Sequence, residues 1–169
     1  SNALEDPAML EVQTEVSGIA ARAGLPVQGL RPSVDGVAVP RVDGHLVRLL
    51  EWLPGALLVD VEGAPAPLLH DLGSVLGRLA AALDGYDHPA AHRDFFWDVL
   101  AMPSVVRDGL ASVTDPERRA LAEAVLDRWT AYVVPALPSL RRAVLHGDAN
   151  DHNVVVDAGT PDRPAERYV

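Results

Sequence analysis

The sequence predicts an α+β protein, with short antiparallel strands in its first third and mostly helices afterwards. Two hairpin signals, Asp35-Gly36 and Asp43-Gly44, separate apolar runs that precede Trp52. After Leu68, apolar residues recur at steps of three and four, which is the period of an amphipathic helix. A structure in which residues 29–52 were helical would contradict this prediction.

The composition is that of a chain able to form one packed domain. It has 169 residues, 49% of them hydrophobic, and no apolar run of membrane-spanning length. Its formal net charge of −10 argues against a nucleic-acid or anionic-membrane partner and would favour a cationic substrate. The chain has no cysteine, which fits a cytoplasmic protein. Residues 1–3, Ser-Asn-Ala, look like the remnant of an expression tag and are left out of the fold.

The first elements are a helix and three strands. A helix is predicted over residues 9–23, because apolar residues recur with helical spacing and Gly24 follows in the position that ends helices. Strands are predicted over residues 30–34, 37–42 and 46–52, in the order of an antiparallel meander.

Helices are predicted for most of the middle of the chain. Residues 68–83 place leucines on one face, and the small residues Gly73, Gly77 and Ala81 would let a partner helix approach. Further helices are expected over residues 98–110 and 114–134, the second with an N-cap and an early proline.

Residues 85–98 combine acidic, aromatic and histidine side chains, and two interpretations stay open. Trp97 and Asp98 could bind the ammonium group of a substrate by cation–π contact and ion pairing. Alternatively, Asp94 caps a helix and the aromatic residues pack in the core. A zinc site is disfavoured by the irregular spacing and the lack of cysteine.

The most informative stretch is residues 144–157, where two valine-rich runs enclose a polar loop. The runs predict buried strands, and Asp148 and Asn153 stand five residues apart between them. A carboxylate can accept the proton of an attacking hydroxyl, and a carboxamide oxygen can help to hold Mg²⁺ on phosphates. His146 could brace the loop backbone. The alternative is a polar hairpin turn.

His146-Gly147-Asp148 followed by Asn153 resembles the catalytic loop of the aminoglycoside phosphotransferase (APH)/choline kinase-like family, relatives of the protein kinases. The wider sequence resembles its hydroxylysine kinase-like branch, which often occurs fused to class III aminotransferase-type enzymes. The resemblance implies Asp148 as catalytic base beside His146, Asn153 as an Mg²⁺ ligand, and Asp151 near the substrate. It also implies ATP or GTP as co-substrate, with Mg²⁺, and a small amine- or hydroxyl-bearing acceptor: an amino alcohol, a hydroxy amino acid or an aminoglycoside-like molecule.

The resemblance also implies a division into lobes. Residues 4–53 would be a partial N-lobe and hinge, with helix C at residues 9–23, and residues 54–169 a truncated, mostly helical C-lobe. Kinases of this type pair an acid of helix C with a lysine that binds phosphates. Glu11 is the first candidate for this acid and Glu15 the second, but all fourteen basic residues here are arginine. Both glutamates could equally be solvated charges.

Residues 49–55, Leu-Leu-Glu-Trp-Leu-Pro-Gly, resemble the family's hinge between the lobes. On that match the carbonyl of Glu51 and the amide of Leu53 would face the nucleotide base. An ordinary strand end closed by Pro-Gly is the alternative.

The sequence matches the middle of the family's fold, from helix C to the seventh strand, and lacks the glycine-rich loop, the lysine and the principal metal-binding aspartate. The isolated chain is therefore expected to be inactive, and a non-catalytic binding or regulatory remnant is a second interpretation. A metallophosphoesterase is a third, since Gly147-Asp148-x-x-Asp151 and Asp43-Gly44-His45 fit two of its motifs. The second of these falls in a predicted turn, and no later Gly-Asn-His follows.

We expect the chain to associate through its partial N-lobe, because an uncovered strand edge is a template for another chain and symmetric dimers are the commonest result. Light scattering after size exclusion at micromolar concentration should give a mass above that of the 18.0 kDa monomer. A clean monomer with protected amides along the edge strand would contradict this expectation.

Overall fold

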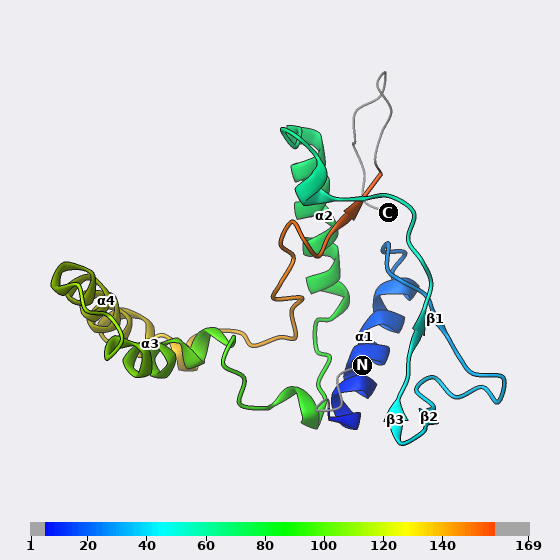
Figure 1. Cartoon of the computed structure of the whole chain (residues 1–169), viewed down its shortest axis with the longest axis horizontal. Helices are drawn as coiled ribbons and strands as arrows, with labels where there is room; N and C mark the ends of the chain where they lie inside the picture. The colour runs from blue at the N-terminus through cyan, green and yellow to red at the C-terminus, as the bar shows by residue number, and fades with distance from the viewer. Residues whose placement is uncertain (1–5, 158–169) are drawn as a thin grey trace. The chain divides into compact units, whose positions relative to one another are not determined.

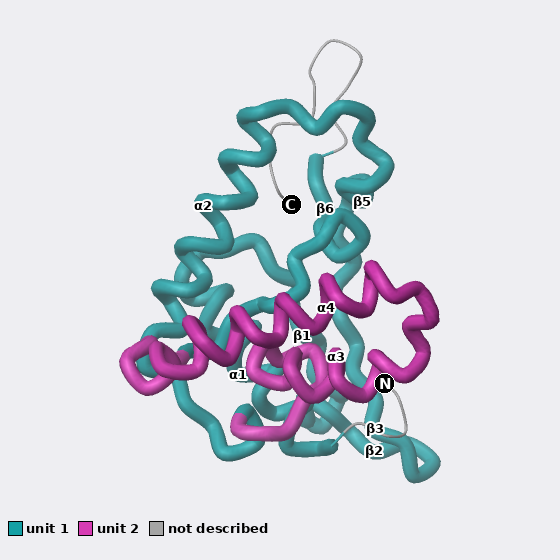
Figure 2. The backbone as a smooth tube through the Cα atoms, turned by 90° about the vertical axis from the view of Figure 1, so that its left-hand side faces the viewer, with its two compact units in different colours: residues 1–91, 143–169 teal, residues 92–142 magenta. Residues whose placement is uncertain are grey.

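The computed structural model describes residues 6–157, which form two compact units (Figures 1 and 2). The first unit combines the chain up to Ala91 with the chain from Ala143 onward, and the second is His92–Arg142. Helices and short antiparallel strands occur together, which confirms the predicted α+β class. The predicted lobe boundary after residue 53 stays a prediction.

Helix α1 (Pro7–Arg22) begins and ends where its flanking residues satisfy the free backbone groups. The Asp6 side chain accepts a hydrogen bond from the amide of Ala8 at 3.0 Å. At the other end, Gly24 has a φ of +67°, and the amide of the buried Leu25 donates to the carbonyl of Ala20 at 3.0 Å. This is the glycine-ended helix stop that the sequence predicted.

The strands between residues 30 and 50 are shorter than predicted and pair in a different order. The pairs are β1 (Leu30–Arg31) with β4 (Leu49–Leu50), and β2 (Arg41–Val42) with β3 (His45–Leu46), all antiparallel. The Asp43-Gly44 hairpin is confirmed, with positive φ at both residues. The sequential meander is wrong, because Pro32 directly follows β1 and Pro40 directly precedes β2, and proline cannot donate to a strand ladder.

Helix α2 (Ala66–Ala82) confirms the helix predicted from residue 68. Leu68 and Leu83 are fully buried, whereas Leu69 is 51% exposed. Among the described residues, nothing lies within 4 Å of a Cβ built on Gly73 or Gly77, so the expected close approach of a partner helix is not found there.

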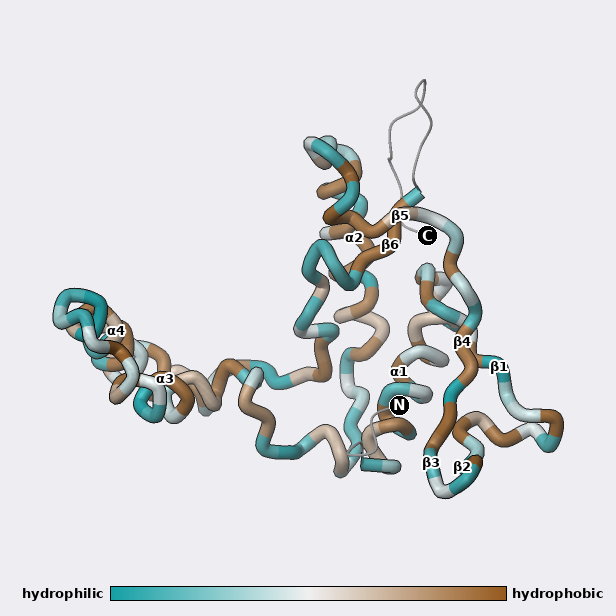
Figure 3. The backbone as a smooth tube through the Cα atoms, in the orientation of Figure 1, coloured by the Kyte–Doolittle hydropathy of each residue, from teal (hydrophilic) through white to brown (hydrophobic). Residues whose placement is uncertain are grey.

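The main core of the first unit lies between α2 and the ladder of β5 (Ala56–Leu57) with β6 (Val155–Val156). Figure 3 shows both strands in the brown of hydrophobic residues. The short 3₁₀ turn η1 (Leu58–Asp60) directly follows β5. The buried members of this core are Leu58, Leu68, Val154 and Val156.

Two side chains tie α1 to α2 and the chain that follows it. Arg78 of α2 donates to the carbonyl oxygens of Ala23 and Gly24, at 3.1 and 3.3 Å, just beyond the end of α1. The hydroxyl of Tyr86 donates to Glu15 of α1 at 2.7 Å. The turn η2 (Pro89–Ala91) also packs against α1.

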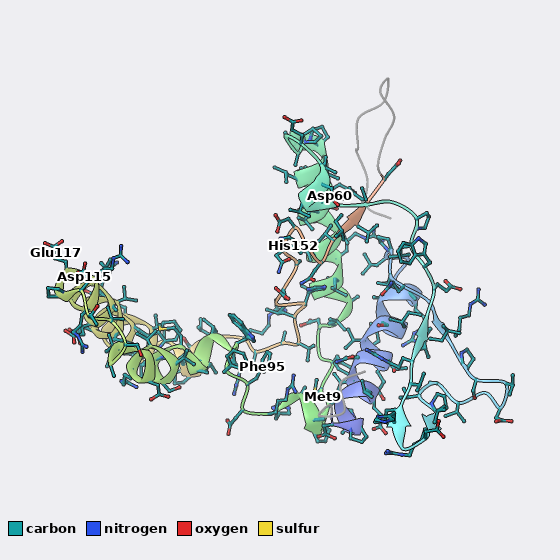
Figure 4. The ribbon with its side chains drawn as sticks, viewed as in Figure 1. Met9, Asp60, Phe95, Asp115, Glu117 and His152 are labelled. Carbon is teal, nitrogen blue, oxygen red and sulfur yellow. The ribbon has the colours of Figure 1, made fainter. Side chains whose placement is uncertain are left out.

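The second unit is a helical hairpin. The turn η3 (Val99–Ala101) leads into α3 (Met102–Leu110), and α4 (Pro116–Arg128) continues into a π-helical turn, η4 (Trp129–Val133), before η5 (Leu137–Ser139). An N-cap was predicted at the start of this helix, and the capping residue is Asp115, which accepts from the amides of Glu117 and Arg118 at 2.9 and 3.1 Å (Figure 4).

In the part of the chain that the structure describes, no helix is both long and apolar enough to cross a membrane.

Replacing Leu68 by alanine should lower the free energy of unfolding by about 2–5 kcal/mol, because the side chain is fully buried in the core. Urea titration followed by circular dichroism measures this change. Leu69→Ala is the matched control on the same helix, with an expected loss on the order of 0.5 kcal/mol for an exposed side chain. Equal losses in the two variants would contradict this account of the core.

Tyr86 should make the stability of the fold depend on pH above 10. Burial and the neighbouring Glu15 carboxylate raise the pKa of Tyr86 from 10.0 to about 12. A pKa raised by folding contributes stability that is present below the unfolded pKa and is lost as the pH rises from about 10 to about 12. The chain has neither lysine nor cysteine, so few other side chains titrate in this range.

The measurement is the free energy of unfolding in urea at several pH values between 9 and 12, at intervals that resolve the expected window. Tyr86→Phe should lose less stability than the unchanged chain as the pH rises. Tyr132→Phe, which alters a side chain that is 75% exposed, is the control. The same fall in stability in Tyr86→Phe and the unchanged chain would show that the Glu15 contact contributes nothing.

Candidate active site

The polar loop between Ala143 and β6 has one end anchored in the core. Val154 and Val156 are buried there, and Ala149 packs against them. The predicted strand before the loop is absent, since residues 144–145 form no ladder and Leu145 is 65% exposed. Here the prediction of two buried strands is wrong, because β6 pairs with β5 instead.

Asp148 and Asn153, five residues apart in sequence, meet in this loop. The side-chain nitrogen Nδ2 of Asn153 donates to the Asp148 carboxylate oxygen Oδ2 at 2.7 Å and to the backbone carbonyl of Asp148 at 2.9 Å. Asp148 is exposed. Because both bonds use the amide nitrogen, the carboxamide oxygen of Asn153 is left without a donor among residues 6–157.

His146 braces the loop as predicted. Its Nδ1 accepts a hydrogen bond from the backbone amide of Asp148 at 3.3 Å. The intervening Gly147 has a φ of +74°, a conformation that favours glycine, so the chain can turn between the two residues.

Two backbone hydrogen bonds join the loop to the turn η1. The amide of Val59 donates to the carbonyl of Asp151 at 3.0 Å, and that of Leu58 donates to the carbonyl of Val154 at 2.9 Å. Figure 4 labels His152 in the loop and Asp60 in η1. The loop therefore lies beside the segment that directly follows the predicted hinge.

Gly55 permits this close approach. A Cβ built on it would lie 2.9 Å from Cγ1 of Val155 and closer still to the carbonyl oxygen of Val156, and its φ is +149°. A larger residue would force β5 and β6 apart. Neither Gly55 nor η1 was among the predicted site residues, since their proximity to residues 151–156 depends on long-range pairing.

The predicted hinge groups lie at the end of β4. The amide of Glu51 donates to the carbonyl of Gly29 at 2.7 Å, and its side chain forms an ion pair with Arg31 at 2.5 Å. The Glu51 carbonyl accepts a long hydrogen bond of 3.4 Å from the Gln28 amide. The amide of Leu53 has no acceptor in the described part of the chain, so a ligand could use it.

The two acidic candidates of α1 differ in their surroundings. Glu15 accepts the hydrogen bond from Tyr86 and so has a structural partner. Glu11 is exposed and forms no ion pair within residues 6–157.

The three candidate substrate residues lie in different units. Asp151 belongs to the loop of the first unit, and its side chain is exposed. Trp97 and Asp98 belong to the second unit, where Trp97 is 75% exposed and its ring lies 4.9 Å from that of Phe96. Asp98 caps η3 by accepting from the amide of Leu100 at 2.8 Å.

The structural interpretation of residues 85–98 was wrong in two details. Asp98, rather than Asp94, is the capping residue. The aromatic side chains are not core either, because the exposed fractions of Phe95 and Phe96 are 41% and 61%. Arg93 instead lies 4.7 Å from the centre of the Phe95 ring, in a cation–π contact.

The donor set of the loop suits Mg²⁺ in part. Magnesium prefers oxygen ligands and is commonly held by one or two side chains together with phosphates. The Asn153 carboxamide oxygen and the Asp148 carboxylate offer such oxygens. No group of three or more potential metal-binding side chains occurs in residues 6–157, so the loop by itself supplies only part of a metal site. The second motif of the metallophosphoesterase alternative, Asp43-Gly44-His45, lies at the β2–β3 turn, as the sequence predicted.

Comparisons with known proteins agree with this geometry. The family described as the phosphotransferase enzyme family (APH) matches residues 5–164. Hydroxylysine kinase from Danio rerio is 30% identical over 179 residues, covering 96% of this chain and 48% of that protein. Hydroxylysine kinase from Bos taurus is 29% identical over 162 residues, covering 89% of this chain and 43% of that protein.

The chain thus spans about half the length of the curated relatives it matches. The predicted resemblance to the hydroxylysine kinase-like branch is confirmed by these relatives. Because the family match covers almost the whole chain, the chain belongs to the APH phosphotransferase enzyme family.

Proposed function

We propose that this chain is part of a small-molecule kinase that transfers the γ-phosphate of ATP or GTP to the hydroxyl of an amino alcohol or a hydroxy amino acid. The observation that carries the proposal is the contact of Asp148 with Asn153 at 2.7 Å in an exposed loop. A carboxylate that can accept a proton, next to a carboxamide whose oxygen can help to hold a metal ion, suits the activation of a hydroxyl beside metal-bound phosphates.

Asp148 acts as the general base in this proposal. Each carboxylate oxygen has two lone pairs, and each accepts one amide hydrogen within the loop, at 2.6 and 2.7 Å. Both oxygens keep a lone pair for the acceptor hydroxyl. As the hydroxyl oxygen bonds to the γ-phosphorus, its proton moves to Asp148, and the bond to the β-phosphate oxygen breaks to release the nucleoside diphosphate.

Asn153 is the proposed metal-binding side chain of this loop. Bound Mg²⁺ would neutralise phosphate charge during the transfer. The two hydrogen bonds that hold the amide nitrogen of Asn153 on Asp148 aim its carboxamide oxygen away from the base. Asn153 would therefore contact both Asp148 and the Mg²⁺ ion that binds the phosphates.

The nucleotide base is proposed to bind the backbone of residues 51–53. The available amide of Leu53 supports this assignment, and the Glu51 carbonyl has only the long Gln28 bond to lose. Glu11 is proposed as the acid of helix C, whose partner in kinases of this type is the lysine that binds the phosphates. Gly55 and η1 join the loop to the hinge. This connection would fix the position of the nucleotide base, bound at the hinge, relative to the phosphates, bound at the loop.

The proposed acceptor class is supported by the relatives, which carry the name hydroxylysine kinase. A hydroxy amino acid or amino alcohol has a cationic amine, and Asp151 offers an exposed carboxylate in the same loop as the base. Trp97 and Asp98 belong to the second unit and stay sequence-based candidates for binding an ammonium group.

We propose that the isolated chain turns over nothing, because it contains no lysine to bind the nucleotide phosphates. The activity is therefore assigned to the longer protein. A non-catalytic binding role is the competing proposal. Phosphotransferase activity of the longer protein would support the kinase, and its absence would support the binding role.

Asp148→Asn in the longer protein should lower kcat by about 10²–10⁴, because the side chain keeps its shape but cannot accept the proton. Steady-state kinetics with hydroxylysine and ATP or GTP, at several Mg²⁺ concentrations, measure the change. The loss should be the same at every Mg²⁺ concentration.

Asn153→Ala is the matched comparison within the same loop. Its main effect should be a higher Mg²⁺ requirement, so that added Mg²⁺ restores part of the rate. If Asp148→Asn retained a kcat close to that of the unchanged protein, Asp148 would not be the base. Rescue of both variants by Mg²⁺ would argue for two metal ligands instead.

A further inference from the structure

Asn150 makes three hydrogen bonds within the loop and has no role in the function proposed above. Its side-chain nitrogen donates to the Asp148 carboxylate oxygen Oδ1 at 2.6 Å. Its side-chain oxygen accepts from the backbone amide of His152 at 3.0 Å. Its backbone carbonyl accepts a hydrogen bond from the backbone amide of Asn153, also at 3.0 Å. No predicted role in the sequence included this residue.

These bonds determine which way the Asn150 side chain is oriented. The His152 amide is a donor, so it requires the oxygen of the Asn150 carboxamide rather than the nitrogen. The nitrogen must then point toward Asp148. This turn, in which an Asn side chain bonds the backbone two residues later, holds the donor in place.

The Asp148 carboxylate is consequently held between two amides. Asn150 donates to one oxygen and Asn153 to the other. Both bonds involve a charged acceptor, which makes them stronger than bonds between neutral groups. Asp148 is exposed, so we expect these two bonds to determine the plane of its carboxylate.

We propose that Asn150 is a positioning residue for phosphoryl transfer, which orients the carboxylate of Asp148 and, through its backbone carbonyl, also holds Asn153 in place. The inference rests on the proposed function of Asp148 as the base. Asn150 acts through these two residues and touches neither reacting group. Its loss should therefore change the rate of the chemical step and leave nucleotide binding unaltered.

The first test uses the chain itself and needs no activity. Three-bond couplings of the Asp148 β-protons, measured by NMR, report whether the side chain keeps one rotamer. One rotamer is expected in the unchanged chain, and averaging over several is expected in Asn150→Ala and Asn150→Asp. His152→Ala is the matched control, because it removes a neighbouring exposed side chain but keeps the backbone amide that Asn150 accepts.

Asn150→Asp separates the two bonds of the side chain. It retains an acceptor for the His152 amide, so the turn survives, but it replaces the donor to Asp148 with a second carboxylate. If Asn150→Ala fails to fold, Asn150→Asp decides the question. A single unchanged Asp148 rotamer in a folded Asn150 variant would overturn the proposal.

The second test uses the longer protein and separates rate from binding. In both Asn150 variants kcat should fall by about 10- to 100-fold, as is typical for loss of a side chain that orients a reacting group. The KM for nucleotide should stay unchanged, and His152→Ala should keep its full rate. A rise in KM with an unchanged kcat would contradict the positioning role.

The two tests fail in distinguishable ways. If the longer protein shows no phosphotransferase activity, the proposed function fails, while the NMR couplings still decide whether Asn150 orients Asp148. If Asp148→Asn loses activity and Asn150→Ala does not, the base assignment stands and the positioning proposal is wrong.

Discussion

The antiparallel pairing of β5 with β6 is the constraint on which the candidate site depends. It brings Ala56 beside Val156, and thus the end of the predicted hinge beside the end of the polar loop. Val154 and Val156 bury their side chains in one cluster with Leu58 and Leu68, so the hydrophobic core anchors this end of the loop. Closing so long a segment of chain costs entropy, which this burial must offset.

Because the hydrophobic core anchors one end of the loop, short-range polar contacts can organise the loop itself. Apart from the anchors at Asp151 and Val154, its hydrogen bonds join residues no more than five apart, from His146 to Asn153. No charged or polar side chain among the described residues is fully buried, so the charge of Asp148 faces water. A solvated carboxylate oriented by two amides pays little for desolvation and keeps lone pairs for a substrate.

Much of this could be predicted from the sequence, because the relevant interactions are local. The α1 stop at Gly24, the Asp115 cap of α4 and the hairpin at Asp43-Gly44 each depend on a few neighbouring residues. The prediction failed where an element needed a distant partner. The run at residues 144–145 is as apolar as a strand, yet it forms no ladder in the structure.

The sequence by itself determined most of the helices and turns, and it placed Asp148 and Asn153 in one polar loop, since spacing and side-chain chemistry specify local structure. Only the tertiary structure decided that β1 pairs with β4, and that Gly55 and η1 meet the loop. Such choices depend on which chain segments compete for the same strand edge or core position, and that competition is settled by burial over long separations in the chain.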